Sequence, residues 1–409
     1  MEKRSIISLF SGAGGLDYGF EAAGFSTAVA LEQDASCCRT LRANTKWPVI
    51  ENDIMAVTNR EILDTSGLKV GDASLLIGGP PCQPFSKSGY WASGDAKRLD
   101  DPRATTLHAY MRVLEGTLPR GFVLENVPGL AFNGKDEGLR LVISLLDGIN
   151  RRCGTSYSIA VRQLNSANYG VPQTRQRVFI IGFREGQEFC FPTPTHWDPG
   201  DEDSELSSTG MIPYRTAWDA LADVENDDLE SLKLTGKWAE LLPSIPEGEN
   251  YQFHTDRGGG MPLFGWRRRY WTFLLKLAKN RPSWTIQAQP GPSTGPFHWN
   301  NRRLSMRELC RLQTIPDTIN VLGDLRTVQR QVGNAVPSLM AEVLARAIQA
   351  QLFGVRKRGS PTLIPPDRSP PPKPEKPASV GRKYRALFGE HAAHPGTGKG
   401  YAAQAKLLL

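Results

Sequence analysis

Short apolar runs alternate with amphipathic segments over the first 185 residues of the chain. Each apolar run is bounded by polar, glycine-rich or proline-rich stretches, which is typical of buried strands. The segment between the first two runs, residues 14–23, has helical spacing. Alternation of this kind predicts βαβ units and an α/β fold with a parallel sheet. The predicted strands are residues 5–10, 27–31, 73–77, 120–124 and 178–183.

The pattern changes after Arg184 to acidic loops, prolines and many aromatic residues. We therefore predict a smaller, irregular domain over residues 186–300. Ser305 and Glu308 form a capping-box pattern that predicts a helix beginning at Met306. An apolar-periodic helix is predicted over residues 338–352. The sequence thus predicts a larger domain made of residues 1–185 plus 301–352.

The C-terminal segment, residues 353–409, is rich in proline and basic residues. It holds eleven Lys or Arg and three Asp or Glu, a balance of +8, whereas the whole chain has a net charge of +7. Residues 1–352 therefore sum to −1, and any argument for nucleic-acid binding by the folded part depends on local patches. The composition predicts a disordered or extended tail.

Length and composition exclude several classes of protein. The 409 residues suffice for two domains, and no run of about twenty apolar residues could span a membrane. The N-terminal apolar run is too short for a signal peptide, which predicts a cytoplasmic location. Six cysteines without disulfide or metal-ligand spacing predict free thiols and no metal site.

One cysteine lies in a stiff turn directly after a predicted strand. The turn is Gly78-Gly-Pro-Pro-Cys82-Gln-Pro-Phe-Ser86. Ligands of open α/β sheets bind at the carboxyl ends of strands, and the flanking prolines restrict the backbone around Cys82. The sequence is consistent with a pre-positioned thiol, and also with a small buried cysteine in a turn.

A glycine-rich loop, Phe10-Ser11-Gly12-Ala13-Gly14-Gly15-Leu16, joins the first strand to the first helix. Its amides and the helix dipole could face an anionic group. Asp17 occupies the position where a dinucleotide fingerprint has its third glycine, and it would repel a pyrophosphate. Glu32 and Asp53 follow the next two strands, where acids can bind ribose hydroxyls and an exocyclic amine. S-adenosylmethionine fits this pattern; a loop that needs glycine only for its backbone geometry is the alternative.

Further candidate residues follow two later strands. Glu125 ends the strand over residues 120–124, and Arg175 and Arg177 alternate on one face of an emerging strand. Such an arginine pair could bind a phosphate or hold a carboxylate, or could lie at a solvated strand edge.

These motifs occur in a characteristic order along residues 5–350. In the identity and the order of these motifs, the chain resembles the DNA (cytosine-5) methyltransferases of bacterial restriction-modification systems. The matching motifs are Phe10-Ser-Gly-Ala-Gly-Gly15, Gly79-Pro-Pro-Cys-Gln83, Asp101-Pro-Arg103 leading to Leu107, Glu125-Asn-Val127, Gln173-Thr-Arg-Gln-Arg177, Arg303-Leu304 through Glu308, and Gln331-Val-Gly-Asn-Ala-Val336.

The resemblance implies a monomeric enzyme with a Rossmann-like, S-adenosylmethionine-dependent methyltransferase sheet and a smaller target-recognition domain. It would transfer a methyl group to C5 of a flipped-out cytosine in a specific double-stranded DNA sequence, and would protect DNA from a cognate restriction endonuclease. Cys82 would be the nucleophile, Glu125 would bind the base, and Arg177 with Arg175 would steady both. The implied cofactor contacts are Phe10, Ser11, Gly12, Gly14, Gly15, Glu32, Asp53, Pro80, Leu107 and Asn334.

Candidate DNA contacts lie in two places. Lys87 and Ser88 belong to a glycine-hinged loop that could close over the target base, although solvent exposure alone explains such a composition nearly as well. Arg267, Arg268 and Arg269 alternate with aromatic residues, which suits phosphate contacts. The aromatic spacing over residues 266–277 is equally consistent with an amphipathic helix. Two rival functions are a related enzyme acting on transfer RNA and a catalytically inactive regulator.

Overall fold

A β-sheet covered by helices is the frame of the larger of two compact units. The computed structural model describes residues 4–81, 105–131, 136–200, 210–225, 228–267 and 270–389. The larger unit, here called the sheet unit, comprises residues 1–226, 280–289 and 305–371, and the smaller unit comprises residues 227–279, 290–304 and 372–409.

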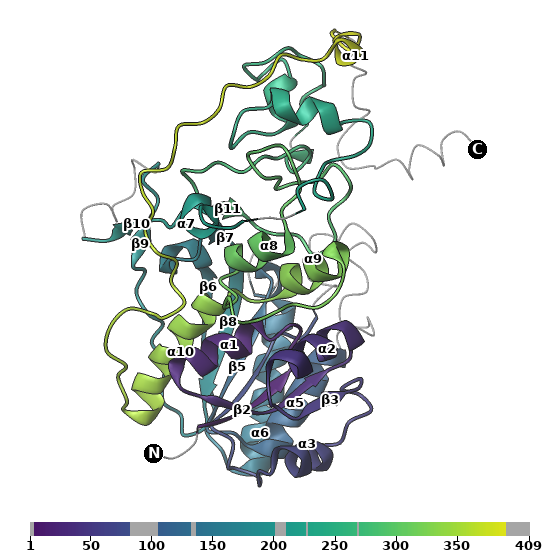
Figure 1. Ribbon diagram of the computed structural model, residues 1–409. Coiled ribbons are helices and arrows are strands. Elements are labelled where there is room, and N and C mark those ends of the chain that lie inside the picture. Colours follow the sequence, from purple (N-terminus) through teal and green to yellow (C-terminus); the bar gives the residue numbers. More distant parts are fainter. Residues whose placement is uncertain are drawn as a thin grey trace. The chain divides into compact units, whose positions relative to one another are not determined.

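Seven strands form the main sheet within the described residues, in the order β3-β2-β1-β4-β5-β8-β6 (Figure 1). The first five are parallel to one another, whereas β8 runs antiparallel to both β5 and β6. The strands are β1 (Ser5–Leu9), β2 (Ser26–Glu32), β3 (Val49–Glu51), β4 (Leu75–Gly78), β5 (Gly121–Asn126), β6 (Ser158–Asn165) and β8 (Gln176–Phe183). The predicted α/β sheet is therefore confirmed.

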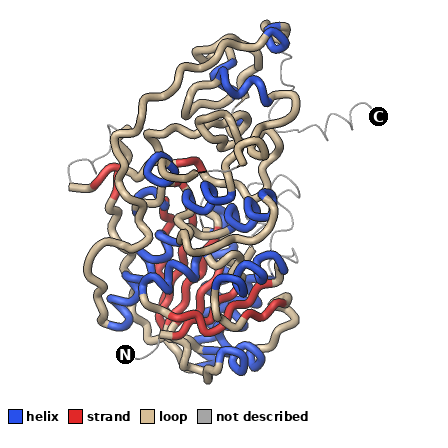
Figure 2. Tube along the Cα trace, viewed as in Figure 1, coloured by secondary structure: helices blue, strands red, loops and turns tan. Residues whose placement is uncertain are grey.

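Helices cover both faces of the sheet (Figure 2). Alternate residues of β1 show this directly, because Ile6 packs into the core on one face and Ile7 into the core on the other. Burial on both faces explains why the parallel strands are almost continuously apolar in the sequence. The helices around the sheet are α1 (Gly15–Ala23), α2 (Ala35–Asn44), α3 (Asn59–Ser66), α5 (Thr105–Thr117), α6 (Glu137–Cys153) and α10 (Ser338–Phe353).

Helices α1 and α10 lie side by side although more than 300 residues separate them in the sequence (Figure 1). Gly19 makes this close approach possible, because a Cβ atom there would lie 2.2 Å from the carbonyl oxygen of Ser338. Through α10 the C-terminal part of the sheet unit returns to the first helix. Two shorter helices precede it, α8 (Met306–Leu312) and α9 (Leu325–Asn334). Ser305 and Glu308 form the predicted capping box at the start of α8.

The remaining elements are short. The sheet unit also holds the paired strands β7 (Gln173–Thr174) and β11 (Ser283–Trp284), the paired strands β9 (His196–Trp197) and β10 (Ile212–Pro213), and α7 (Ala217–Leu221). Two 3₁₀ turns, η4 (Pro128–Leu130) and η5 (Ser166–Tyr169), complete it.

The smaller unit has little regular structure among its described residues, as predicted for an irregular domain. Its turns are η7 (Ala239–Ser244) and η8 (Tyr251–His254), and α11 (Arg382–Arg385) ends it. An apolar core that includes Leu241, Tyr251 and Phe297 holds it together. The alternative prediction of a helix over residues 266–277 is wrong, because the described residues there form turns and isolated bridges.

The C-terminal segment is placed as far as residue 389 and is not disordered there. Thr362 and Leu363 donate their backbone N–H groups to the Glu342 carboxylate at 2.8 and 2.9 Å. Val380 and Tyr384 belong to the core of the smaller unit. Of the two predicted alternatives, disordered or extended, the described part of this segment is the extended one. Few apolar residues anchor it, and their partners lie far away in the sequence. The unit boundaries also differ from the predicted domain boundaries, since residues 186–226, 280–289 and 353–371 belong to the sheet unit, and residues 301–304 and 372–409 to the smaller unit.

Candidate active site

The glycine loop is shaped by residues that need unusual backbone conformations. Gly12 and Gly14 have positive φ angles of 55° and 85°, a region that favours glycine. A Cβ atom on Gly15 would lie 2.5 Å from the carbonyl oxygen of Val336, so this glycine lets the chain after α9 approach the loop. Space is open where a Cβ of Gly12 would lie. The loop therefore presents accessible backbone at the start of α1.

Asp17 lies behind this loop in the first turn of α1 and is fully buried. The Thr27 hydroxyl donates to its Oδ1 at 3.4 Å, and Oδ2 has no hydrogen-bond partner among the described residues. Desolvation raises the pKa of this carboxyl from 3.8 to about 7. Burial of Asp17 thus favours its neutral form, which reduces the negative charge beside the glycine loop.

Asp17→Asn is expected to stabilise the protein at alkaline pH. The folded-state pKa lies above the unfolded value, so ionisation costs stability increasingly as pH rises from about 4 through about 7. At pH 8 the variant should exceed wild type by roughly 2–4 kcal/mol in free energy of unfolding, and at pH 4 the two should be similar. Urea unfolding at both pH values tests this, with the exposed Asp64→Asn as control. An equal difference at both pH values would contradict the explanation.

Glu32 and Asp53 lie at the carboxyl ends of neighbouring strands, as predicted. Glu32 Oε2 accepts the Gly12 N–H at 2.8 Å, and its Oε1 accepts the N–H groups of Gln33 and Asp34 at 2.9 and 2.8 Å. Three donors thus fix the carboxylate, and one of its roughly four acceptor positions remains for a ligand. Asp53 Oδ1 accepts the Met55 N–H at 2.9 Å.

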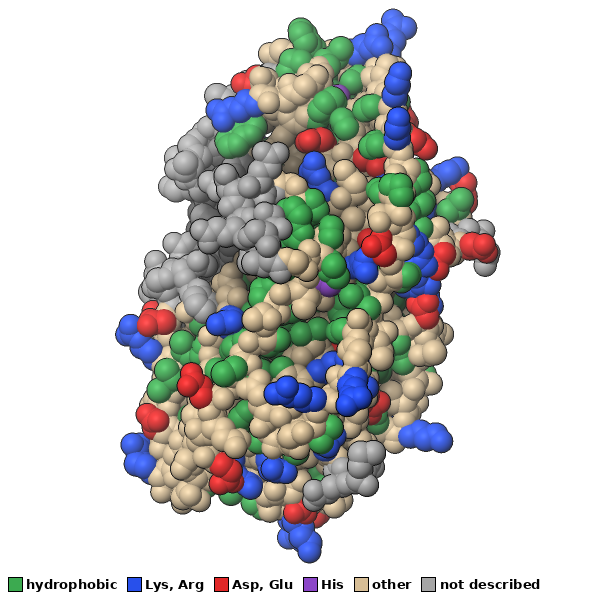
Figure 3. Space-filling view, turned by 90° about the vertical axis from the view of Figure 1, so that its left-hand side faces the viewer, with side chains coloured by type: hydrophobic (Ala, Val, Ile, Leu, Met, Phe, Trp, Pro, Cys, Tyr) green, Lys and Arg blue, Asp and Glu red, His purple; other side chains and the backbone are tan. Residues whose placement is uncertain are grey.

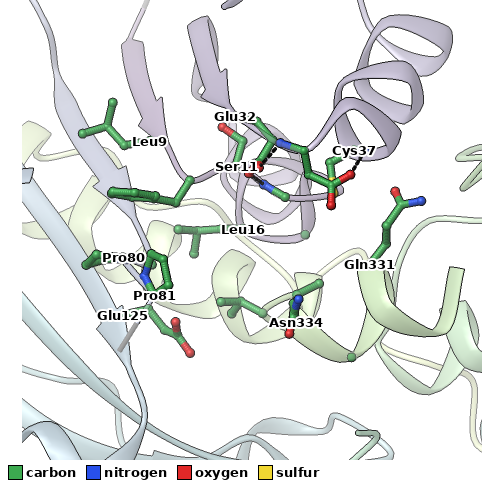
Figure 4. Close-up of a pocket in the computed structure, with 18 of the residues that line it drawn as sticks. Leu9, Ser11, Leu16, Glu32, Cys37, Pro80, Pro81, Glu125, Gln331 and Asn334 are labelled. Atoms are coloured by element: carbon green, nitrogen blue, oxygen red, sulfur yellow. Dashed lines mark hydrogen bonds between the residues drawn. The ribbon is translucent and has the colours of Figure 1, made fainter. Parts of the chain in front are cut away.

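Two cavities at this edge of the sheet unit collect most of the predicted site residues. The larger has a volume of about 530 Å³, and the smaller, about 330 Å³, shares Phe10, Glu32, Gln33 and Pro81 with it. In Figure 4, Ser11 and Glu32 lie on one side of the larger cavity, Gln331 and Asn334 on another, and Pro80, Pro81 and Glu125 on a third. Predicted residues lining the larger cavity are Phe10, Ser11, Gly12, Gly15, Glu32, Pro80, Glu125, Arg175, Arg177 and Asn334; Asp53 lines the smaller one.

Two predicted cofactor contacts line neither cavity. Gly14 is the N-cap of α1, and a Cβ atom there would meet the Tyr18 ring at 2.8 Å. Leu107 is buried in the core between the sheet and α5. In the structure Leu107 packs in this core, and its predicted contact with the cofactor stays a prediction.

Glu125 and Arg177 form an ion pair at the larger cavity. Arg177 Nε lies 2.9 Å from Glu125 Oε1, and the two side chains are only 18% and 12% exposed. Desolvation raises the pKa of Glu125, although Arg177 and Arg175 oppose this shift. The carboxyl is thus adjusted to carry a proton more readily than an exposed glutamate, which suits proton exchange with a ligand.

The chain leading to Cys82 approaches this pair closely. A Cβ atom on Gly79 would lie 2.8 Å from Glu125 Oε2, so glycine lets the chain pass without displacing this carboxylate. Asn126 Nδ2 donates to the Pro80 carbonyl at 3.1 Å and holds the turn in place. Pro81 lines both cavities and is the last described residue before Cys82, which itself lies outside the described residues.

Arg175 is a buried link between distant segments of the sheet unit. Its guanidinium donates to the carbonyl oxygens of Gly333 at 2.9 Å and Ile286 at 3.4 Å. Burial, and then repulsion from Arg177, lowers its pKa well below the usual value. Arg175 therefore ties the end of α9 to the strand region that carries Arg177.

Comparison with known proteins agrees with this arrangement. Residues 4–350 match the family model of the C-5 cytosine-specific DNA methylases. The chain belongs to this family. It is 41% identical to the Type II methyltransferase M.SacI of Streptomyces achromogenes, over 88% of this chain and 96% of that protein. It is 33% identical to M.NgoFVII of Neisseria gonorrhoeae, over 85% and 86%. The Dnmt2 methyltransferase of S. pombe has the same fold, with a TM-score of 0.56 at 15% identity over 86% of this chain and 99% of that one.

The predicted DNA (cytosine-5) methyltransferase activity and its methyl donor, S-adenosylmethionine, are therefore confirmed. The two connected cavities fit this donor. The open backbone at Gly12 lies at the amino end of α1, where an amino-acid carboxylate binds favourably. The carboxylates of Glu32 and Asp53 line the smaller cavity, where they can accept hydrogen bonds from ribose hydroxyls and an adenine amine.

The predicted DNA contacts fall mostly outside the described residues. This applies to Lys87, Ser88, Arg268 and Arg269. Arg267 lies in the smaller unit, where its backbone N–H donates to the Tyr251 hydroxyl at 3.0 Å. On the face shown in Figure 3, described Lys and Arg side chains are interspersed with acidic and hydrophobic ones, in line with the near-zero charge of residues 1–352.

Several residues that line the larger cavity were not predicted from the sequence as site residues, among them Asp34, Cys37 and Arg330. Asp34 could have been found from its position, because it is an N-cap residue two positions after Glu32. Arg330 directly precedes the Gln331–Val336 motif. Nothing in the sequence indicated that these two segments meet.

No metal site or membrane span is found in the part of the chain that the structure describes. It contains no group of three or more His, Cys, Asp or Glu placed to hold a metal ion. It also contains no helix of the length and hydropathy that crossing a membrane requires. The five described cysteines are unpaired thiols.

Proposed function

We propose that the cavity bearing the Glu125–Arg177 ion pair holds a cytosine flipped out of double-stranded DNA, with Cys82 as the nucleophile. The observation that carries this proposal is the ion pair itself, which lies beside the turn to Cys82 and on the cavity that fits the methyl donor. A base stacked in a duplex could not reach these groups, so flipping is required and costs a few kcal/mol.

The proposed chemistry begins with activation of the ring. Carbon C5 of cytosine is a poor nucleophile. The Cys82 thiolate adds to C6, and the electrons of the C5–C6 double bond move into the ring. Glu125 hydrogen-bonds or protonates N3 and accepts from the exocyclic amine, which stabilises the developing charge. Arg177 donates a hydrogen bond to the carbonyl oxygen of the base and keeps the Glu125 carboxyl in position through their ion pair.

The later steps restore the aromatic ring. Bound S-adenosylmethionine supplies the methyl group that C5 receives. The C5 proton then leaves to a base, the C6–S bond breaks, the C5–C6 double bond re-forms, and Cys82 is released as a thiolate.

The cavity residues divide the binding of the methyl donor among them. Glu32 accepts from the ribose hydroxyls and Asp53 from the adenine amine, while the Phe10 ring packs against the adenine. The amino end of α1, which follows the glycine loop, faces the amino-acid carboxylate. Pro80 and Asn334 line the remaining wall of the larger cavity. Arg175 acts indirectly, by fixing the backbone near Asn334 relative to Arg177.

Sequence specificity is assigned to the smaller unit. It presents exposed aromatic side chains, Trp266 and Tyr270, and the Arg257 guanidinium lies 4.3 Å from the Trp266 ring centroid. Arg267, Arg268 and Arg269 supply phosphate contacts, and Lys87 with Ser88 fills the space that the flipped base leaves. The enzyme acts as a cytoplasmic monomer that protects DNA from a cognate restriction endonuclease. The near relatives named as Type II methyltransferases support this role.

Transfer of radiolabel from S-adenosylmethionine to plasmid DNA and to total RNA tests the proposal. We expect label on DNA, and bisulfite sequencing should map it to one cytosine within one recurring sequence word. Label confined to RNA would refute the proposal in favour of the transfer-RNA enzyme. No label on either would favour the inactive regulator.

A further inference from the structure

Two segments from opposite ends of the chain face each other across the larger cavity. The first is the junction of β2 and α2, which contributes Glu32, Asp34 and Cys37 to the lining. The second is the C-terminal half of α9, which contributes Arg330, Gln331 and Asn334 (Figure 4 labels several of these residues). The width of the cavity therefore depends on how α9 is held against α2.

A buried row of hydrogen bonds forms one seam between these helices. The Thr40 hydroxyl donates to Gln331 Oε1 at 2.8 Å and accepts the Leu322 N–H at 3.1 Å. Gln331 Nε2 in turn donates to the Leu322 carbonyl at 2.8 Å. Thr40 and Gln331 are buried, and breaking this row would leave polar groups unsatisfied. The Thr40–Gln331 contact should therefore persist when more exposed contacts between the two helices break.

A second seam lies on the cavity side and is more exposed. Arg330 Nη1 lies 2.5 Å from Asp34 Oδ2, and Nη2 donates to the Ser36 hydroxyl at 3.1 Å. The Arg330 and Asp34 side chains are 37% and 26% exposed. Asp34 also caps α2 by accepting the N–H groups of Ser36 and Cys37. Arg330, Asp34 and Ser36 are called the clasp below.

We propose that Arg330 is a positioning residue whose clasp holds α9 against α2 and so retains the methyl donor in its cavity. An exposed ion pair of this kind is worth about 1 kcal/mol or less, so it can open and close while the buried Thr40–Gln331 seam stays intact. Both terminal nitrogens of Arg330 are bound within the clasp. These bonds use two of the five N–H donors of the guanidinium, and we assign the effect of Arg330 to its contacts with Asp34 and Ser36.

Arg330→Gln tests the clasp. S-adenosylmethionine binding is measured without DNA, by calorimetry for Kd and by stopped-flow displacement for the dissociation rate. We expect Kd and the dissociation rate to rise about two- to fivefold, corresponding to loss of a weak ion pair. With DNA and saturating donor, kcat should change less than KM for the donor. A Kd equal to that of wild type would overturn the proposal.

Asp34→Asn separates the clasp from direct contact with the donor. The asparagine oxygen can still cap α2, but the ion pair is lost. This variant should weaken donor binding as Arg330→Gln does, and the double variant should be no weaker than the worse single one. Additive effects, or a defect in Arg330→Gln alone, would show that Arg330 contacts the donor and would overturn the proposal.

Arg326→Gln is the matched control, because Arg326 is exposed on the same helix and lines neither cavity. Its donor affinity and melting temperature should equal those of wild type. Raising the salt concentration from about 0.05 to about 0.5 M should narrow the difference between wild type and Arg330→Gln, because screening weakens the ion pair in wild type. The inference needs only the donor cavity, so it is tested whether or not the proposed roles of Cys82 and Glu125 hold.

Discussion

Glu125→Gln is expected to lower kcat for methyl transfer to DNA by about a thousandfold, within the range of general acid–base catalysis. Glutamine has nearly the same shape but cannot protonate N3, and it loses the ion pair with Arg177. Single-turnover methyl transfer measures the effect. Donor Kd should change only a few-fold, because the donor's ribose and adenine are assigned to other residues.

The pH profile strengthens this test. Burial raises the pKa of Glu125, so a protonated fraction persists at higher pH than for an exposed glutamate. The rate should therefore fall as pH rises past that pKa, and Glu125→Gln should lack this fall. Glu115→Gln is the control, since Glu115 lies on α5, pairs with Arg152 and lines neither cavity. Turnover like that of wild type in Glu125→Gln would end the proposed mechanism.

Cys82→Ala is expected to reduce methyl transfer to background while leaving donor binding measurable. Without the thiolate nothing adds to C6, so C5 does not become nucleophilic. DNA carrying 5-fluorocytosine at the target position provides a second test. The fluorine cannot leave as a proton does, so wild type should form a covalent protein–DNA adduct that persists in denaturing gels.

Cys190→Ala is the matched control, because Cys190 is an exposed free thiol that lines neither cavity. It should turn over and form the adduct like wild type. Adduct formation by Cys82→Ala would mean that another residue attacks the base, and would refute the role of Cys82.

Local patterns predicted much of the site because its residues sit where strands end. Glu32, Asp53 and Glu125 each follow an apolar run, and parallel strands bring such positions to one edge of the sheet. Leu107 was predicted from its motif alone. It packs in the core beside α5, and its contact with the cofactor stays a prediction.

Composition left the structure open where a few distant contacts decide it. The proline-rich segment after α10 was predicted to be disordered or extended, and it is extended because Glu342 accepts two of its backbone N–H groups and Tyr384 packs in the core of the smaller unit. The aromatic spacing over residues 266–277 matched a helix that buries its aromatic side chains. In the fold Trp266 and Tyr270 are exposed, whereas Phe273 packs against the core of the smaller unit.

Strand periodicity, glycine loops and strand-end acids are local signals, so the amino-acid sequence was enough to predict the α/β sheet, the family and most of the candidate site residues. Which of those residues meet became known only from the fold. It placed Arg177 on Glu125, buried Asp17 and Leu107, made Arg175 a link to α9, and brought Arg330 to Asp34 across 296 positions of sequence. Such contacts depend on where α9 and α10 pack against the sheet. That packing joins apolar faces of segments far apart in the sequence, so no single segment reveals it.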